Sequence, residues 1–239
     1  MIWIGIDDTD IFGSPGTNQM ARAIVAALAD DWDCRFILRH QLLDDPRVPY
    51  TSKNGSASID LTPRHPSTPS PATIAHVADI CERVMRLRFV DGSDPGLCVA
   101  SSVPKSLQEF GRRCQREVVL KSQAQTLAHD AGILLRGLGG TNGGVIGALA
   151  AVGLASTRDD GRVVVLGNYP DLTGIVTPEH LADMGITVLD ANTNTRIETG
   201  TIDLVKKLRP NISQGRIILY SRPSTPPDNS TADWLAMKM

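Results

Sequence analysis

The sequence predicts a mixed α/β fold, and three features of the chain carry that prediction. Apolar segments of strand length, such as residues 34–43 and 56–61, alternate with amphipathic helical segments such as residues 72–88. An apolar strand at residues 2–6 runs into a loop and then a helix. Residues 133–153 repeat this order of strand, loop and helix, with a glycine-dense loop. We therefore expect an α/β (α+β) protein of two closely packed parts.

The composition is that of a globular protein with balanced charge. Of 239 residues, 41% are hydrophobic, and 24 Lys and Arg oppose 26 Asp and Glu, which gives a formal net charge of -2. A global basic field for nucleic acid is therefore absent, although a local basic patch is compatible with these numbers. Only 4% of the residues are aromatic. This argues against an extended platform for stacking bases.

The cysteines and the hydrophobic runs bear on metal content and location. Cys34, Cys81, Cys98 and Cys114 are spread through the chain without a C-x-x-C pair, so we expect no zinc site. We interpret them as reduced, mostly buried side chains, because the chain is neither short nor rich in cysteine. The sequence shows no secretory signal and no apolar run of membrane-spanning length. We expect a cytoplasmic location without membrane partners.

The first strand ends in a cluster of carboxylates. Asp7, Asp8 and Asp10 follow the apolar residues 2–6 directly. Crowded carboxylates have raised pKa values unless a cation neutralises them, and hard oxygen ligands suit Mg²⁺ or Mn²⁺ shared with substrate phosphates. An acidic turn in which aspartate acts as a cap is the alternative. The position at the end of an N-terminal strand favours the metal site.

A helix begins just after this acidic loop. Gly16 and Thr17 precede apolar residues that recur at helical spacing over residues 20–28, and Thr17 is a suitable N-cap residue. A helix N-terminus offers free N–H groups and a partial positive charge. We therefore expect a phosphate to bind between the metal and this helix.

A second candidate anion site lies in the strand, loop and helix of residues 133–153. Its loop contains Gly139, Gly140, Gly143 and Gly144, and glycines let the backbone approach an anion closely. The loop is not a P-loop, because no Gly-Lys-Ser/Thr ends it, and it lacks the G-x-G-x-x-G pattern of dinucleotide-binding folds. Tight packing of the following helix is the alternative explanation.

A third polar loop lies between the strands at residues 34–43 and 56–61. Residues 48–55 contain Tyr50, Lys53 and Asn54 among other donors that suit phosphate or sugar. An ordinary turn built on Asn54 and Gly55 is equally compatible with this segment.

The remaining elements follow from periodicity. We expect helices at residues 106–117, 122–131 and 178–184, and strands at 97–101, 162–166, 186–189, 201–208 and 216–221. The arginines of the helices, including Arg83, Arg86, Arg88, Arg112, Arg113 and Arg116, are interpreted as solvated surface charge, and His129 as a surface residue.

The proline-rich run at residues 62–72 suggests a boundary in the chain. We predict an N-terminal part with the acidic loop over residues 1–61 and a second part with the glycine loop over residues 62–221. Residues 222–239 are predicted to be a flexible tail, in which Trp234 is a candidate docking residue.

Several motifs, in order, resemble those of the tRNA(Ile2) agmatinylcytidine synthetases. They are Gly5-Ile6-Asp7-Asp8-Thr9-Asp10, Val48-Pro49-Tyr50, Asp94-Pro95-Gly96 and the run from Gly144 to Gly153. The resemblance covers roughly residues 1–220. It implies a kinase-like α/β domain with a packed ferredoxin-like subdomain.

Members of that family use ATP and Mg²⁺ to activate a cytidine of an isoleucine tRNA by phosphorylation, and agmatine then displaces the phosphate. The resemblance implies that Asp7, Asp8 and Asp10 bind Mg²⁺ and phosphate, and that the glycine loop contacts the nucleotide. Lys53 lies near the position of a basic residue that follows the family's Pro-Tyr pair.

The chain also departs from the family pattern. The family's acidic loop continues into Gly-x-Cys-Thr-Thr, whose threonine is thought to take part in phosphoryl transfer, whereas this chain reads Gly16-Thr17-Asn18-Gln19-Met20. Thr17 is the candidate substitute. We expect no counterpart in this sequence to the family's oligonucleotide-binding fold and zinc ribbon, because the cysteine pairs of a zinc site are missing. A small molecule is therefore expected as acceptor, with tRNA as the second possibility.

The sequence leaves three classes of function open. The first is an ATP-dependent kinase or activating transferase, with Asp7, Asp8, Asp10 and Thr17 as catalytic residues and an aspartate as the base. The second is a non-catalytic module that binds a nucleotide or a partner. The third is a structural protein whose acidic loop is merely a cap. The sequence does not identify the acceptor, and it is compatible with a homo-oligomer.

Overall fold

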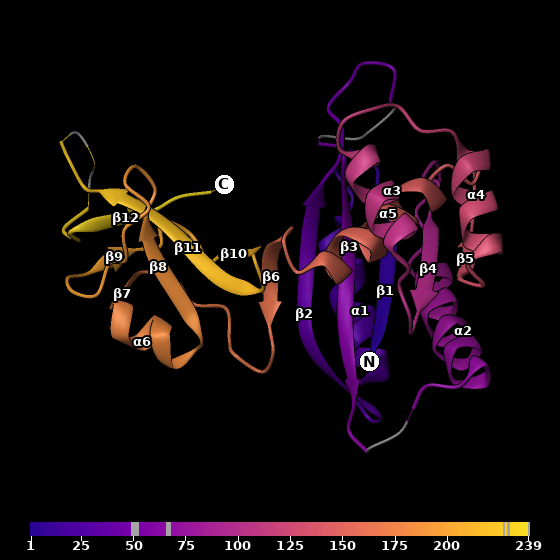
Figure 1. Cartoon of the computed structure of the whole chain (residues 1–239), viewed down its shortest axis with the longest axis horizontal. Helices are drawn as coiled ribbons and strands as arrows, with labels where there is room; N and C mark the ends of the chain where they lie inside the picture. The colour runs from indigo at the N-terminus through magenta and orange to yellow at the C-terminus, as the bar shows by residue number, and fades with distance from the viewer. Residues whose placement is uncertain (49–52, 66–67, 227, 229, 239) are drawn as a thin grey trace.

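The computed structural model describes residues 1–48, 53–65, 68–226, 228 and 230–238. Within these residues it contains six helices and twelve strands joined in one mixed sheet, so the predicted α/β fold class is confirmed (Figure 1). The sheet continues from a larger part, flanked by helices, into a smaller part that contains the C-terminal strands (Figure 1).

In the larger part of the protein, the elements begin and end close to the positions that the sequence predicts. The helices are α1 (Thr17–Leu28), α2 (Pro71–Leu87), α3 (Lys105–Cys114), α4 (Lys121–Asp130), α5 (Val145–Thr157) and α6 (Pro178–Asp183). The strands are β1 (Ile2–Asp7), β2 (Trp32–Gln41), β3 (Gly55–Pro63), β4 (Gly96–Ala100), β5 (Leu134–Gly137), β6 (Arg162–Leu166), β7 (Ile175–Val176), β8 (Ile186–Asp190), β9 (Ile202–Asp203), β10 (Asn211–Ser213), β11 (Arg216–Pro223) and β12 (Trp234–Ala236).

The strand order is β5-β4-β1-β3-β2-β6-β10-β11-β12-β9-β7, and β8 pairs with β11. Strand β1 lies between β3 and β4 and is antiparallel to both. Because β2 is also antiparallel to β3, β1 and β2 run in the same direction. The ends of β1, β2 and β5 therefore lie at the edge of the sheet where β3, β4 and β6 begin.

Two apolar cores hold the helices on the larger part of the sheet. One core joins α1 and α2 to residues such as Ile4, Ile37 and Ile59. The other joins α3, α4 and α5 to Cys98 and Ala100. Helix α5 is buried along most of its length, as its almost entirely apolar sequence requires. A third core gathers α6 and β8 in the smaller part.

Glycines let α5 approach the sheet and α3 closely. A side chain at Gly5 of β1 would collide with the carbonyl oxygen of Ala148, and one at Gly153 would collide with the carbonyl of Leu107. The small residues of α5 therefore serve close packing, as one interpretation of the sequence held.

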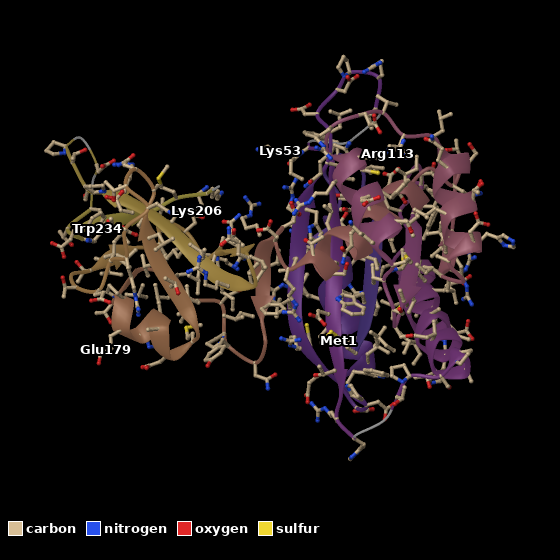
Figure 2. All side chains as sticks on the ribbon, in the orientation of Figure 1. Met1, Lys53, Arg113, Glu179, Lys206 and Trp234 are labelled. Carbon is tan, nitrogen blue, oxygen red and sulfur yellow. The ribbon has the colours of Figure 1, made fainter. Side chains whose placement is uncertain are left out.

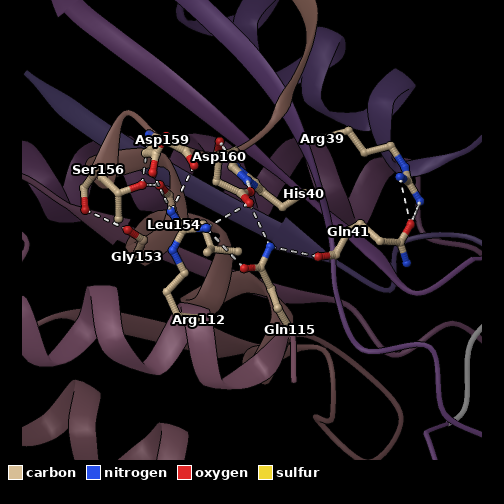
Figure 3. Close-up of polar contacts among 12 residues, drawn as sticks. Arg39, His40, Gln41, Arg112, Gln115, Gly153, Leu154, Ser156, Asp159 and Asp160 are labelled. Atoms are coloured by element: carbon tan, nitrogen blue, oxygen red, sulfur yellow. Dashed lines mark hydrogen bonds and ion pairs between the residues drawn. The ribbon is translucent and has the colours of Figure 1, made fainter. Parts of the chain in front are cut away.

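A polar network ties α3 to the connection between α5 and β6 (Figure 3). The His40 ring is buried. Its Nδ1 lies 2.6 Å from Asp160 Oδ1, and its Nε2 lies 2.8 Å from Ser58 Oγ. Arg112 and Gln115 also donate to Asp160 Oδ2. Burial alone would raise the pKa of Asp160, but the hydrogen bond from His40 and the charge of Arg112 lower it. Arg112 is thus paired with carboxylates, and its assignment to solvated surface charge was wrong.

The C-terminal segments differ from the sequence prediction in detail. Within residues 201–208, only Ile202–Asp203 forms a strand, and β7, β10 and β12 are short strands that were not predicted. Trp234 lies in β12, which pairs with β11 and β9. The division of the chain after residues 61 and 221 stays a proposal; residue 61 lies within β3.

Two further expectations concern side chains and hydropathy. The four cysteines are free and buried, as predicted. Among the described residues, no helix is both long enough and apolar enough to cross a membrane.

The contact between β1 and α5 predicts the effect of a single methyl group. Gly5→Ala is expected to destabilise the protein by about 1–3 kcal/mol, because its Cβ must displace the backbone of α5. Urea unfolding followed by circular dichroism measures this change. An unchanged midpoint would show that α5 does not lie this close to β1.

Candidate functional site

A cavity of about 370 Å³ lies at the edge of the sheet where β1 and β2 end. It brings together eight of the ten predicted site residues: Asp7, Asp8, Asp10, Gly16, Thr17, Lys53, Gly143 and Gly144. Lys53 lies toward the same end of the larger part as Arg113 (Figure 2). Leu42, Leu43, Val118 and Val119 add an apolar wall.

The acidic loop has a backbone conformation that directs its carboxylates into the cavity. Asp8 has a φ of 51°, in the left-handed region, which is uncommon for a residue other than glycine. Its carbonyl oxygen accepts a hydrogen bond of 3.1 Å from the backbone N–H of Asp94. Asp7 lies against the first turn of α5, where a side chain at Gly147 would collide with its carboxylate. The loop is therefore held both by α5 and by the segment that leads into β4.

The carboxylates of this loop hold their protons unusually well. Burial, followed by the charges of Asp8 and Asp10, raises the pKa of Asp7 to about 7, although a backbone hydrogen bond opposes the shift. Burial and the charges of Asp94 and Asp10 raise the pKa of Asp8 to about 6. Burial also raises the pKa of Asp10, against hydrogen bonds from Thr17. Such crowding is stabilised by a bound cation.

The N-terminus of α1 opens into the same cavity. Gly16 is its N-cap, without a side-chain capping bond, and Thr17 is the first helical residue. Thr17 is therefore not the N-cap that the sequence suggested. Its hydroxyl accepts a hydrogen bond of 3.1 Å from Thr9 and donates one of 3.5 Å to Asp10. Thr17 thus belongs to a short chain of hydroxyls that leads to a carboxylate.

The glycine loop is ordered by Asp94, a residue that sequence reasoning did not select as a site residue. Asp94 Oδ2 accepts hydrogen bonds from the N–H and hydroxyl groups of Thr141 and from the N–H of Gly143. Its carbonyl oxygen accepts one from the N–H of Gly144. Asp94 Oδ1 is buried with no partner in the described residues. Asp94 thus fixes the N-terminus of α5 beside the acidic loop.

The other two predicted glycines have a different position. Gly139 packs against Phe89 and Pro95, and Gly140 adopts a φ of 56° beside Asp94. Neither is among the residues that line the cavity. These glycines shape the loop, while Gly143 and Gly144 line the cavity.

A second residue that sequence reasoning missed is Arg39 on β2. Arg39 lines the cavity and donates to Gln41. A side chain at Gly55 on the neighbouring strand would collide with the guanidinium group. The Arg39 side chain thus packs over a glycine of the adjacent strand, and the hydrophobic periodicity of the sequence does not reveal such a contact. Pro49, Tyr50, Thr51 and Ser52 of the predicted polar loop lie outside the described residues.

The donor set of the cavity bears on whether a metal ion fits there. In the ranges that the structure describes, no three His, Cys, Asp or Glu side chains are grouped to hold one ion. Four aspartates nevertheless line the cavity, and Asp94 Oδ1 is unpartnered among the described residues. This set fits Mg²⁺, which commonly takes one or two protein carboxylates and completes its shell with water and substrate phosphates.

The fold is similar to that of solved tRNA-modifying proteins. A TiaS–tRNA(Ile2)–ATP complex superposes with a TM-score of 0.57 at 22% identity, over 75% of this chain and 40% of that chain. A tRNA fluorescent labeling enzyme superposes with a TM-score of 0.54 at 23% identity, over 64% of this chain and 35% of that chain. For a TiaS–tRNA(Ile2)–AMPCPP–agmatine complex, the TM-score is 0.53 at 21% identity, over 63% of this chain and 35% of that chain.

These similarities concern the fold. They confirm the resemblance that the motifs indicated, and they fit the expected kinase-like and ferredoxin-like arrangement. The chain spans about two fifths or less of the length of these proteins. No protein-family model and no curated protein matches the chain.

The raised pKa of Asp7 makes stability depend on pH. Between the ordinary aspartate pKa of 3.8 and the native pKa of about 7, the native carboxyl holds a proton that the unfolded chain has released. Stability without added metal should therefore fall as pH rises through this window. Asp7→Asn should reduce that fall, measured by urea unfolding at pH 5 and pH 8. Asp30→Asn, just beyond the far end of α1, is the control, and equal pH dependence in wild type and Asp7→Asn would contradict the assignment.

Proposed function

We propose that this chain binds ATP with Mg²⁺ in the cavity and transfers a phosphoryl group to activate a nucleoside of RNA. The observation that carries the proposal is the convergence of two helix N-termini and a cluster of carboxylates on one cavity. Helix N-termini favour phosphate, and crowded carboxylates favour a cation. Magnesium-bound triphosphate supplies both charges.

Each wall of the cavity has a role in this proposal. Asp7, Asp8 and Asp10 would hold Mg²⁺, which neutralises charge on the transferred group when bound. The N-terminus of α1 near Gly16 and Thr17 would bind phosphate oxygens, and the N-terminus of α5, whose Gly143 and Gly144 line the cavity, adds its partial positive charge. Lys53 and Arg39 add positive charge to the lining. The apolar wall gives a nucleobase a surface that excludes water.

Thr17 is the candidate carrier of the phosphoryl group. Its hydroxyl lies in the cavity and donates to Asp10, whose pKa is raised. A carboxylate with a raised pKa is suited to accept the hydroxyl proton as the threonine oxygen bonds to the γ-phosphorus of ATP, while the bond from that phosphorus to ADP breaks and ADP leaves. Thr17 lies near the position of the threonine in the Gly-x-Cys-Thr-Thr run of the resembling family.

The RNA acceptor rests on the similar structures. They include TiaS bound to tRNA(Ile2) with ATP, and TiaS bound to tRNA(Ile2) with AMPCPP and agmatine. This similarity favours an RNA nucleoside over a free metabolite as acceptor. An amine such as agmatine is then the second substrate that would displace the phosphate.

A nucleotide-binding module without catalysis is the second candidate. It is favoured by one feature, the replacement of the Cys-Thr-Thr sequence by residues 18–20. The two candidates differ in their products, because only the enzyme converts ATP when Mg²⁺ and RNA are present.

Asp8→Asn tests the central claim. The substitution keeps the size of the side chain but removes the charge, so we expect at least a roughly hundredfold loss of Mg²⁺-dependent ATP turnover with the fold retained, since charge neutralisation supplies several kcal/mol in such reactions. ATP consumption is measured with and without tRNA, and Asp30→Asn is the matched control. Turnover equal to that of wild type would remove the claim.

Thr17→Val tests the phosphoryl carrier. Incubation with ATP and Mg²⁺ should add the mass of one phosphoryl group to the wild-type chain but not to Thr17→Val, because valine keeps the shape of threonine and lacks the nucleophile. Intact-protein mass spectrometry detects the adduct. An adduct of the same yield on the variant would exclude Thr17 as the carrier.

A further inference from the structure

Two arginines beside the cavity lack carboxylate partners. Arg39 of β2 and Arg162 of β6 are opposite each other in the register of these neighbouring strands. Adjacent strands lie about 4.8 Å apart, so the two side chains start close together. Among the described residues, neither guanidinium lies within 4.0 Å of a carboxylate oxygen in an ion pair. Two half-buried cations therefore lie side by side, and neither forms an ion pair within the described residues.

The environment of these arginines opposes their charge. Arg162 Nε is buried and has no hydrogen-bond partner in the described part of the chain. Burial, followed by the charge of Arg162, lowers the pKa of Arg39, and Asp7 is the carboxylate that acts against this shift. Burial and the charge of Arg209 lower the pKa of Arg162. A bound anion would relieve the repulsion between the two guanidinium groups.

The basic surface extends from Arg162 toward the smaller part of the protein. Arg209 lies two residues before Asn211, which pairs with Arg162. It shares one carboxylate, Asp171, with Arg22 and Lys207. The cations therefore outnumber the carboxylates along a path that begins at the cavity and crosses β2, β6 and the start of β10.

Neighbouring arginines, in contrast, form ion pairs with carboxylates. Arg35 and Arg158 both face Asp60, at 3.9 and 3.1 Å. Arg112 faces Asp159 and Asp160 (Figure 3). These pairs explain their arginines by folding alone. Arg39 and Arg162 have no such explanation.

We propose that Arg39, Arg162 and Arg209 bind the phosphodiester backbone of a single RNA strand beside the nucleoside that enters the cavity. This inference rests on the proposed function for its acceptor. A row of cations on β2, on β6 and just before β10 fits a ligand with repeated phosphates better than a single small anion, and arginine binds phosphate through two parallel hydrogen bonds. Such a row of arginines would let a chain with a net charge of -2 bind RNA at one local surface.

The test uses Arg162→Gln and Arg162→Lys in the full chain. A fluorescein-labelled single-stranded oligoribonucleotide is titrated at several salt concentrations, and Mg-ATP binding is measured by calorimetry. Arg162→Gln should weaken RNA binding roughly tenfold and lower the salt slope by about 1, because one phosphate contact is lost. Arg162→Lys should retain most of the slope. ATP affinity should be unchanged in both.

The matched control is Arg83→Gln, which removes an exposed arginine of α2 away from the path. An equal loss in this variant, unchanged RNA affinity in Arg162→Gln, or no RNA binding by the wild type would overturn the proposal. So would a loss of ATP affinity in place of RNA affinity, since Arg162 would then belong to the nucleotide site. Arg162-dependent RNA binding without any ATP binding would refute the proposed function and leave this inference standing.

Discussion

The close approach of α5 to β1 determines the geometry of the candidate site. Gly5 and Gly96 meet the backbone of Ala148 and Gly144 at distances that no side chain allows. This contact sets the N-terminal turn of α5 directly beside the end of β1, where the acidic loop starts. The carboxylate of Asp7 and the glycine loop therefore share one cavity although they lie far apart in the sequence.

The cavity combines two requirements that neither wall satisfies alone. The carboxylates repel one another, and burial raises the pKa values of Asp7 and Asp8. The two helix N-termini, in contrast, attract anions. A cation or a phosphate alone would meet only one of these conditions. A complex of a divalent cation with a polyphosphate meets both, and this complementarity is why an acidic cluster beside two helix N-termini suggests a nucleotide.

The sequence predicts well those features that depend on neighbouring residues. Asp7, Asp8 and Thr17 are recognised from a strand, a loop and a helix that follow one another, and Gly143 and Gly144 from the same pattern. Asp94 was missed as a site residue because its role depends on the pairing of β4 with β1 and on the turn after β5. Arg39 was missed because its guanidinium group packs over Gly55 of the neighbouring strand, and this contact depends on how the two strands pair. Strands of two or three residues, such as β9, are too short to show a period.

The net charge of the chain conceals how its charges are distributed. The carboxylates of Asp7, Asp8, Asp10 and Asp94 line one side of the cavity. Arg39 lines the same cavity from β2, and neither Arg39 nor Arg162 on the adjoining β6 forms an ion pair within the described residues. A global balance of charges cannot distinguish this segregation from a surface of paired ions. The fold makes the distinction, because it sets Arg158 against Asp60 but sets Arg39 against Arg162. The unpaired arginines beside the candidate cavity are thus a product of the fold, and they are the surface that we propose for a polyanion on a slightly acidic protein.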